Sequence, residues 1–282
     1  MSKSRNVTGR GVALALALSA IGIGGNAKAA DYLRGAYAGE TAPQAAAGPD
    51  WAGYYGGVHA SASTGQFDPT GFASPLAHAA LPNSTIEDLL RNTINLRTTN
   101  KMGYGVGGFV GINYLWDDVV MGLEADYTRS SLNGTSTFGP YGLSRDVGTE
   151  RWSVTSTSTT RGRITDWGTI RGRIGYAAGM FMPYFTAGLA LGNVDGRAST
   201  TGTWTNTSTA TPAAHLPISG NFEGVVGRRG ISYGTAFGGG LDMQILPNTF
   251  LRTEYQHIQF AGGGKRPDIS INTARVGGGI KF

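Results

Sequence analysis

The chain has 282 residues and no cysteine, which excludes both a disulfide framework and a thiolate metal site. Four cations, Lys3, Arg5, Arg10 and Lys28, precede the first acidic residue; without them the formal net charge falls from +5 to +1, so the basic balance gives no argument for nucleic-acid binding. The 46 glycines, 11 Phe and 12 Tyr, beside only 15% charged residues, suit glycine-spaced strands with aromatic anchors and suit a helical enzyme poorly.

Residues 1–29 have the three-part pattern of a secretory signal peptide. The first cations are followed by an apolar run at 11–25, which is short for a bilayer span, and Ala27 and Ala29 supply small residues for a signal peptidase. We predict cleavage after Ala29, and a retained membrane anchor is the alternative. Residues 30–50 are predicted to be a flexible periplasmic leader, so that the folded domain occupies residues 51–282.

Eight later segments alternate apolar residues with polar or small ones for about ten residues, the length that a tilted strand needs to cross a membrane. In the clearest of them, Ile231, Tyr233 and Phe237 share one parity, while Ser232 and Gly234 share the other. No apolar run after the signal reaches the ~20 residues of a membrane helix. The eight predicted strands are residues 52–63, 102–116, 119–130, 165–178, 182–194, 231–245, 249–260 and 269–282.

This alternation fits either a soluble β-sandwich with its apolar face inside, or a membrane barrel with its apolar face in lipid. The connections favour the barrel, because short periplasmic turns alternate with long extracellular loops in such proteins. We therefore predict an all-β fold, an eight-stranded antiparallel up-and-down transmembrane β-barrel whose last strand pairs with its first. The short connections are 117–118, 179–181 and 246–248, and the long ones are 64–101, 131–164 and 195–230.

The polar faces of the predicted strands carry charges of both signs, which would pair in a closed interior. We predict a lumen ion-pair network of nine residues: Glu124, Asp126, Arg171, Arg173, Asp242, Arg252, Glu254, Arg275 and Lys281. Aromatic residues near the strand ends are predicted to form girdles at the two headgroup levels. These are Tyr114, Trp116, Tyr127, Tyr176, Phe185, Tyr233 and Phe250.

Seven short motifs, in this order, cover nearly all of the chain after the leader. They are WAGYYGG (51–57), GGFVGINY (107–114), GLEADY (122–127), GTIRGRIGY (168–176), PYFTAGL (183–189), LRTEY (251–255) and VGGGIKF (276–282). In them the chain resembles the eight-stranded outer-membrane proteins of alphaproteobacteria, known as porin-family or opacity-family proteins, with an OmpA-like transmembrane barrel. The three long loops depart from that pattern.

The resemblance implies residence in the cell outer membrane of a Gram-negative bacterium and a role in envelope integrity, with surface-exposed loops. It also implies insertion by the outer-membrane assembly machinery, for which the terminal aromatic Phe282 would be the assembly signal. We expect the partners to be outer-membrane lipid and lipopolysaccharide, together with periplasmic chaperones during biogenesis. No nucleic acid is expected, and the resemblance leaves any extracellular partner unknown.

An eight-stranded barrel is just wide enough for its own side chains, so we predict a lumen plugged by ion pairs. A passive porin-like channel for small hydrophilic solutes, or a loop-mediated adhesin or haem receptor, is the alternative. We predict no cofactor, because His59, His78, His215 and His257 show no tight ligand spacing. We predict no catalytic residues and no enzyme, because the chain lacks the His-x-Ser of the similar lipid A deacylases: Gln259 follows two places after His257.

The long loops contain two further signals. Residues 84–87 (STIE) form a capping box, and Leu89, Leu90 and Ile94 follow at helical spacing, which predicts a short helix over the barrel mouth. Such a helix could cover apolar surface or form an adhesive surface. The second and third loops are rich in Ser and Thr, and the sequence leaves open whether they are strands extending above the membrane or disordered.

Overall fold

The computed structural model describes residues 50–211, 213, 215–260 and 268–282. The predicted signal peptide and almost all of the predicted leader, residues 1–49, lie outside the described residues, and those boundaries stay predictions.

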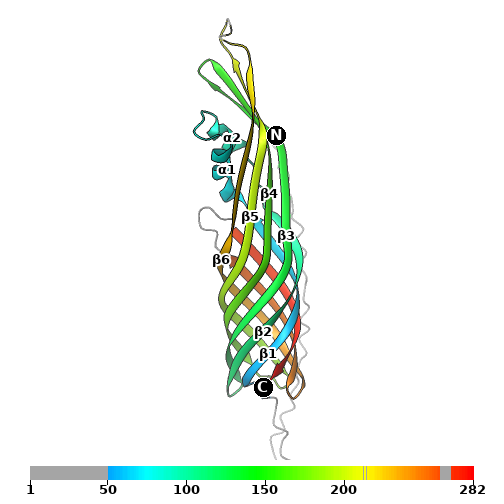
Figure 1. Ribbon diagram of the computed structural model, residues 1–282. Helices are drawn as coiled ribbons and strands as arrows, with labels where there is room; N and C mark the ends of the chain where they lie inside the picture. The colour runs from blue at the N-terminus through cyan, green and yellow to red at the C-terminus, as the bar shows by residue number, and fades with distance from the viewer. Residues whose placement is uncertain (1–49, 212, 214, 261–267) are drawn as a thin grey trace, which may run out of the picture. The chain divides into compact units, whose positions relative to one another are not determined.

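The described residues form eight antiparallel strands in a closed ring, in chain order, with β8 pairing back onto β1 (Figure 1). All eight predicted segments are strands, so the predicted fold class is confirmed. Closure leaves no sheet edge that would expose unpaired backbone groups to lipid. The strands are β1 (Gly53–Asp68), β2 (Thr99–Trp116), β3 (Val119–Val147), β4 (Glu150–Tyr176), β5 (Phe181–Ser208), β6 (Ile218–Leu246), β7 (Thr249–Phe260) and β8 (Asp268–Lys281).

Alternation assigns the two faces of each strand, as the membrane half of β4 shows. Ile170 and Ile174 are exposed on the outside, whereas Arg171 and Arg173 are buried inside. Six of the seven predicted girdle aromatics are also exposed on the outside. Phe250 is the exception: it is 5% exposed and lies in the lumen, because it shares the parity of Arg252 on β7. Its position at a strand end therefore did not identify it as a girdle residue, whereas its parity places it inside.

Four of the strands continue far beyond the membrane (Figure 1). The Ser/Thr-rich segments within 131–164 and 195–230 are strands, which extend β3 against β4, β4 against β5 and β5 against β6. Their hydroxyl groups pair across the sheet, as between Thr137 and Thr159 at 3.0 Å and between Ser158 and Thr200 at 3.2 Å. These two loops were predicted to be either strands that extend above the membrane or disordered segments, and in the structure they are extended strands.

The connection from β1 to β2 contains a short 3₁₀ turn, η1 (Thr70–Phe72), and two helices, α1 (Ala73–Ala80) and α2 (Glu87–Thr93). The helix predicted from the capping box is therefore present as α2, but its N-cap is Ile86 and the Ser84 hydroxyl donates to the Leu81 carbonyl at 3.1 Å. The helix α1 was not predicted from the sequence. Within the described ranges, no helix is long and apolar enough to cross a bilayer.

The two helices pack on the inner face of the extended strands and form a second apolar core there. Leu76 and Leu90 are fully buried against Val154 of β4, Ala198 of β5 and Phe222 of β6. The helices thus cover apolar surface of the hairpins, as one of the two roles considered for them required. We call this assembly, made of residues 70–96 and the extended parts of β3, β4, β5 and β6, the extracellular unit.

Gly224 sets how closely α1 approaches β6. A Cβ atom at this position would lie 2.8 Å from the Leu76 carbonyl oxygen and 2.8 Å from the Ala80 Cβ, so Gly224→Ala must displace the helix. Overpacking of this kind costs about 1–3 kcal/mol, and we expect α1 to lose that much protection in hydrogen exchange. Gly227→Ala, whose Cβ would meet its nearest neighbour at 3.6 Å, is the matched control. Equal protection of α1 in the two variants would contradict this packing.

Candidate functional site

The middle of the lumen holds a cluster of eight charged side chains, four cations and four anions, each 6% exposed or less. They come from five strands, and pairs two residues apart lie on the inner face because side chains in a strand alternate. We call this cluster the ionic layer. It consists of Glu124, Asp126, Arg171, Arg173, Asp242, Arg252, Glu254 and Arg275.

Arg171 lies at the centre of the ionic layer. Its Nη2 is 2.7 Å from Glu124 Oε1 and 3.0 Å from Asp126 Oδ2, while its Nη1 is 2.6 Å from Glu254 Oε1. The Nη1 group also donates to the Thr186 hydroxyl at 3.0 Å. One guanidinium therefore joins three carboxylates through donors in a fixed planar arrangement, whereas the three donors of a lysine ammonium group are gathered on one nitrogen.

Arg252 and Arg173 share the carboxylate of Asp242. Arg252 binds it with two parallel contacts, Nε to Oδ1 at 2.8 Å and Nη2 to Oδ2 at 2.9 Å, and its Nη1 reaches Glu124 Oε2 at 2.5 Å. Arg173 donates to the same Asp242 carboxylate. A bidentate pair of this kind fixes geometry as well as charge.

Arg275 closes the ionic layer on the β8 side. Its Nη2 lies 3.2 Å from Asp126 Oδ1, and its Nη1 lies 3.6 Å from Glu254 Oε1. With it the eight formal charges sum to zero. Burying ions is costly unless each finds a partner, and here each of the eight does.

Lys281, which was predicted to be the ninth member, lies apart from the ionic layer. It sits at the last position of β8, at the periplasmic end of the barrel, where its Nζ is 3.8 Å from Asp50 Oδ2. Its parity was right, but a side chain at the strand end does not reach the middle of the lumen. Phe282, the predicted assembly signal, is exposed next to it, and its N–H donates to the Tyr54 carbonyl at 2.9 Å.

An aromatic layer fills the lumen on the periplasmic side of the ionic layer. The rings of Tyr55, Phe109 and Phe250 lie 6.0 to 6.2 Å apart, and the Arg252 guanidinium lies 4.2 Å from the centre of the Phe109 ring. Trp51 is buried in the same cluster and donates its indole N–H to the Gly179 carbonyl at 3.2 Å. These rings cover the charged groups from the periplasmic end, with cation–π contacts as part of the interface.

An apolar layer fills the lumen on the extracellular side. We expected polar side chains inside the barrel and apolar ones in lipid, but in the extracellular half the inner face is apolar. The parity of the strands already pointed to the difference, because Ile258 and Phe260 share the face of Glu254, and Ile269 and Ile271 share the face of Arg275. The layer consists of Phe67, Leu132, Ile164, Trp167, Ala190, Val194, Ala236, Ile258, Phe260, Ile269 and Ile271.

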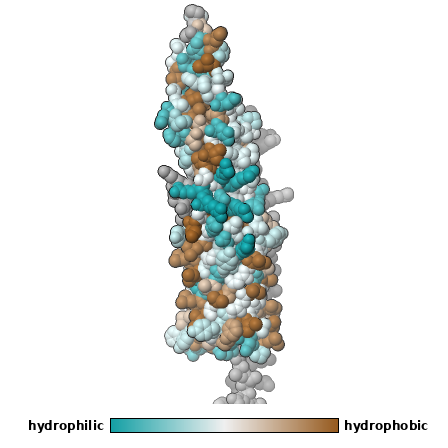
Figure 2. Space-filling view, in the orientation of Figure 1, coloured by the Kyte–Doolittle hydropathy of each residue, from teal (hydrophilic) through white to brown (hydrophobic). Residues whose placement is uncertain are grey.

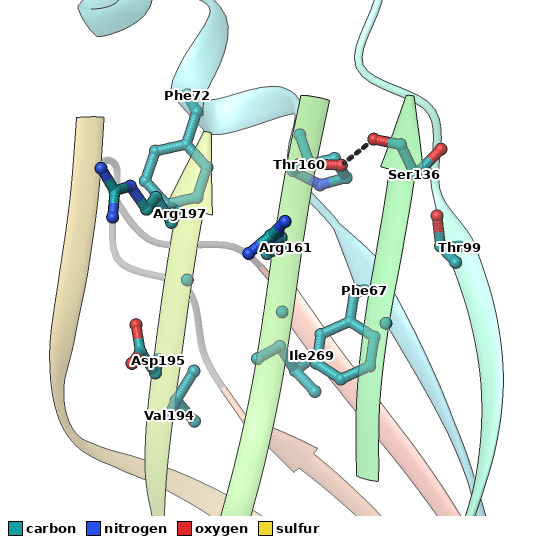
Figure 3. A pocket seen from close by; sticks show the side chains of 14 residues that line it. Phe67, Phe72, Thr99, Ser136, Thr160, Arg161, Val194, Asp195, Arg197 and Ile269 are labelled. Carbon is teal, nitrogen blue, oxygen red and sulfur yellow. Dashed lines mark hydrogen bonds between the residues drawn. The ribbon is translucent and has the colours of Figure 1, made fainter. Parts of the chain in front are cut away.

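A recess lies at the extracellular mouth of the lumen, above the apolar layer (Figure 3). Phe67, Val194 and Ile269 belong to both, so the floor of the recess is the top of the apolar layer. Phe72, from the turn before α1, also lines it, and the Thr160 hydroxyl donates to the Ser136 carbonyl at 3.5 Å beside it. The recess thus ends on packed side chains.

Each of the four histidines contacts a different polar residue. In the lumen, the His59 Nε2 is 3.1 Å from the Thr128 hydroxyl, and on β7 the His257 Nδ1 is 2.8 Å from Asn272 Oδ1. His78 pairs with Glu87 at 3.3 Å and His215 with Glu150 at 3.6 Å, both in the extracellular unit or its edge. Among the residues that the structure describes, no group of three or more His, Cys, Asp or Glu could hold a metal ion.

Tyr55 connects the aromatic layer to the ionic layer. Its hydroxyl donates to Glu124 Oε2 at 2.9 Å and accepts from Arg173 Nη1 at 3.3 Å. We expect Tyr55→Phe to lower the free energy of unfolding by about 1–3 kcal/mol, because a buried carboxylate loses a donor. The neighbouring Tyr54→Phe is the control, since Tyr54 is exposed on the outer face. Urea titration of the refolded proteins measures both, and an equal effect of the two substitutions would contradict this role of the hydroxyl.

Comparison with known proteins agrees with this architecture. Residues 13–282 match the family described as outer membrane protein beta-barrel domain. The 31 kDa outer-membrane immunogenic proteins of Brucella melitensis and Brucella suis are each 26% identical over 256 residues, covering 82% of this chain and 84% of the relative.

Among solved structures, Ail, the attachment invasion locus protein of Yersinia pestis, is 10% identical, with a TM-score of 0.33 over 82% of this chain and 99% of that one. The N-terminal β-barrel domain of Pseudomonas aeruginosa OprF is 16% identical, with a TM-score of 0.30 over 80% of this chain and 97% of that one. The match over residues 13–282, with the closed ring of eight strands, identifies the chain as a member of the outer membrane protein beta-barrel family, located in the bacterial outer membrane.

Proposed function

We propose that the protein is a closed, non-enzymatic structural barrel that contributes to the integrity of the outer membrane and presents an ordered extracellular unit. One observation carries the proposal: the lumen is filled by three layers in succession, aromatic, ionic and apolar. A path for hydrated solutes would have to cross all three. The ionic layer alone could hydrate, but the side chains of the apolar layer above it offer water a single polar group, the Trp167 indole N–H, and a buried water needs about two to four partners.

Each charged group of the ionic layer pairs with an oppositely charged group of the same layer. The side chains of Arg171 and Arg173 are 0% exposed, and that of Arg252 is 3% exposed. A conducting lumen would instead keep some charged groups in contact with water. This burial supports the closed barrel over the passive channel for small hydrophilic solutes.

The same burial supports a non-enzymatic role. His59 and Thr128 form a hydroxyl–imidazole contact that resembles part of a nucleophile–base pair. Both residues are buried inside the lumen, with exposed fractions of 6% and 0%. A substrate would have to displace packed side chains to reach them, so we assign this contact to the packing of the lumen.

A second candidate, recognition of an extracellular partner, is favoured by the extracellular unit. Its own apolar core, built around Leu90, Val154 and Phe222, holds the hairpins and helices in a fixed arrangement. Fixed surfaces lose less conformational entropy on binding than disordered loops do.

A deletion strain separates these functions. Loss of the protein should raise the uptake of a hydrophobic dye by intact cells, and the full chain should restore the barrier. A shortened chain, with residues 70–96, 138–158 and 200–224 replaced by tight turns, keeps the barrel and should restore it equally. Restoration by the full chain but not by the shortened chain would mean that the extracellular unit is needed for the barrier. Unchanged dye uptake in the deletion strain would contradict the structural role. Assembly of the shortened chain is checked by its heat-modifiable migration in gels.

A further inference from the structure

Five arginines gather on the outer face of β3, β4, β5 and β6, just above the lipid-facing part of the barrel. All five side chains are exposed. Figure 2 shows strongly hydrophilic side chains in a band across this face, above the apolar side chains of the barrel. We call the group the arginine band: Arg129, Arg161, Arg163, Arg197 and Arg229.

The position of the arginine band along the strands matches the outer headgroup level. On β5 the outward residues Phe185, Leu189 and Leu191 are exposed and apolar. The apolar outward stretch begins at Phe181 and ends at Leu191, and about ten residues is the length that a tilted strand needs to cross the hydrocarbon. Arg197 follows on the same face. The short turns lie at the other end of the barrel, so the band faces the outer leaflet.

The charges of the arginine band are only partly compensated by the protein itself. Arg161 and Arg197 are direct partners across β4 and β5, an arrangement of like charges that destabilises a sheet (Figure 3). Two acids lie among them: Asp166 is the cross-strand partner of Arg129, and Asp195 is the cross-strand partner of both Arg163 and Arg229. Among the described residues, none of the five guanidinium groups has a carboxylate within the 4.0 Å of an ion pair. The band therefore keeps an excess of positive charge that an external anion would stabilise.

The opposite side of the barrel has a different rim. Gln259 of β7, Ser270 of β8, Gln66 of β1 and Asn100 of β2 are paired in one row across the outer face of these strands, and all four are uncharged. A general requirement for cations near headgroups would act on every strand. Among the described residues, this row has no cation while β3 to β6 carry five exposed arginines, and the difference indicates a localised anion site.

We propose that the arginine band binds the phosphate groups of a phosphorylated glycolipid headgroup in the outer leaflet, of the lipopolysaccharide type. The planar guanidinium fork matches phosphate oxygens with two parallel hydrogen bonds, and neighbouring forks can hold one phosphate between them. A lipid is the occupant because its acyl chains would lie along the apolar strands directly below the band. The inference rests on the location in the outer membrane and not on the closed lumen, so a conductance measurement does not decide it.

The test uses protein purified from outer membranes into detergent and titrated with lipid A that carries both phosphates, or with the same lipid after dephosphorylation. We expect the phosphorylated lipid to bind at least about tenfold more tightly, and its affinity to fall as salt is added. Equal binding of the two lipids by the unaltered protein would overturn the proposal, whatever the variants do.

Three triple variants assign the site. Arg161→Gln/Arg163→Gln/Arg197→Gln should lose at least about tenfold in affinity for the phosphorylated lipid, whereas the corresponding Lys substitutions should stay within about threefold because they keep the charge. Arg91→Gln/Arg145→Gln/Arg151→Gln removes the same charge from the extracellular unit and should stay within about twofold. An equal loss in this control, or no loss in the first variant, would contradict the assignment. Heat-modifiable migration confirms that each variant is folded.

Discussion

Arg171→Met is expected to lower the free energy of unfolding by about 3–5 kcal/mol, because it leaves buried carboxylates without their shared partner. Arg171 lies within 3.0 Å of oxygens of Glu124, Asp126 and Glu254, and its side chain is 0% exposed. Methionine fills a similar volume without charge, so the loss reports on electrostatics more than on packing. Urea titration of the refolded barrel in lipid vesicles measures it.

Arg163→Met is the matched control for this substitution. Arg163 is on the same strand, but it is exposed on the outer face. In vesicles without phosphorylated glycolipid, we expect its substitution to change the free energy of unfolding by no more than about 0.5 kcal/mol. If Arg171→Met were as mild as Arg163→Met, the ionic layer would not be a set of buried, mutually dependent charges.

Trp167→Ala should have an effect of similar size for a different reason. Trp167 is 1% exposed in the apolar layer, and its truncation would leave a cavity that the surrounding strands, fixed in a closed ring, are poorly able to fill. Truncations of buried aromatic residues cost about 3–5 kcal/mol. The same urea titration tests this value.

Trp167→Phe separates the loss of packing from the loss of the indole N–H. The buried Nε1 atom has no acceptor among the described residues, so its removal costs no hydrogen bond. We expect the phenylalanine variant to retain more than half of the stability that the alanine variant loses. Equal destabilisation by the two substitutions would contradict the explanation by cavity size.

The membrane-crossing strands could be predicted from the sequence because a strand with one face in lipid must alternate with period two. Around Thr155 and Thr157, above the membrane, this alternation of apolar and polar residues is absent, because both faces carry small polar residues. What distinguishes those strands from disorder is the packing of Leu76 and Leu90 on their inner face, a contact between segments far apart in the chain. No local pattern records such a contact.

The ionic layer was partly predictable. Strand parity placed Arg171 and Glu254 on the inner face, yet their contact at 2.6 Å, across strands that are not neighbours, depends on the tilt and register of the closed barrel. The apolar layer was missed although Ile258 and Phe260 share the inner parity. The interiors of transmembrane barrels are generally polar, but that of an eight-stranded barrel is small enough to be packed like a protein core.

The central claim, that three packed layers close the lumen, is tested most directly by current recordings across a planar lipid bilayer into which the purified protein has been inserted. The same sample is first shown to be folded by its heat-modifiable migration in gels. The three layers predict no reproducible current steps, and none in Arg171→Ser/Arg252→Ser either, because the apolar layer remains in place above the altered charges. Steady, reproducible current steps from the unaltered protein would contradict a closed lumen and establish a channel.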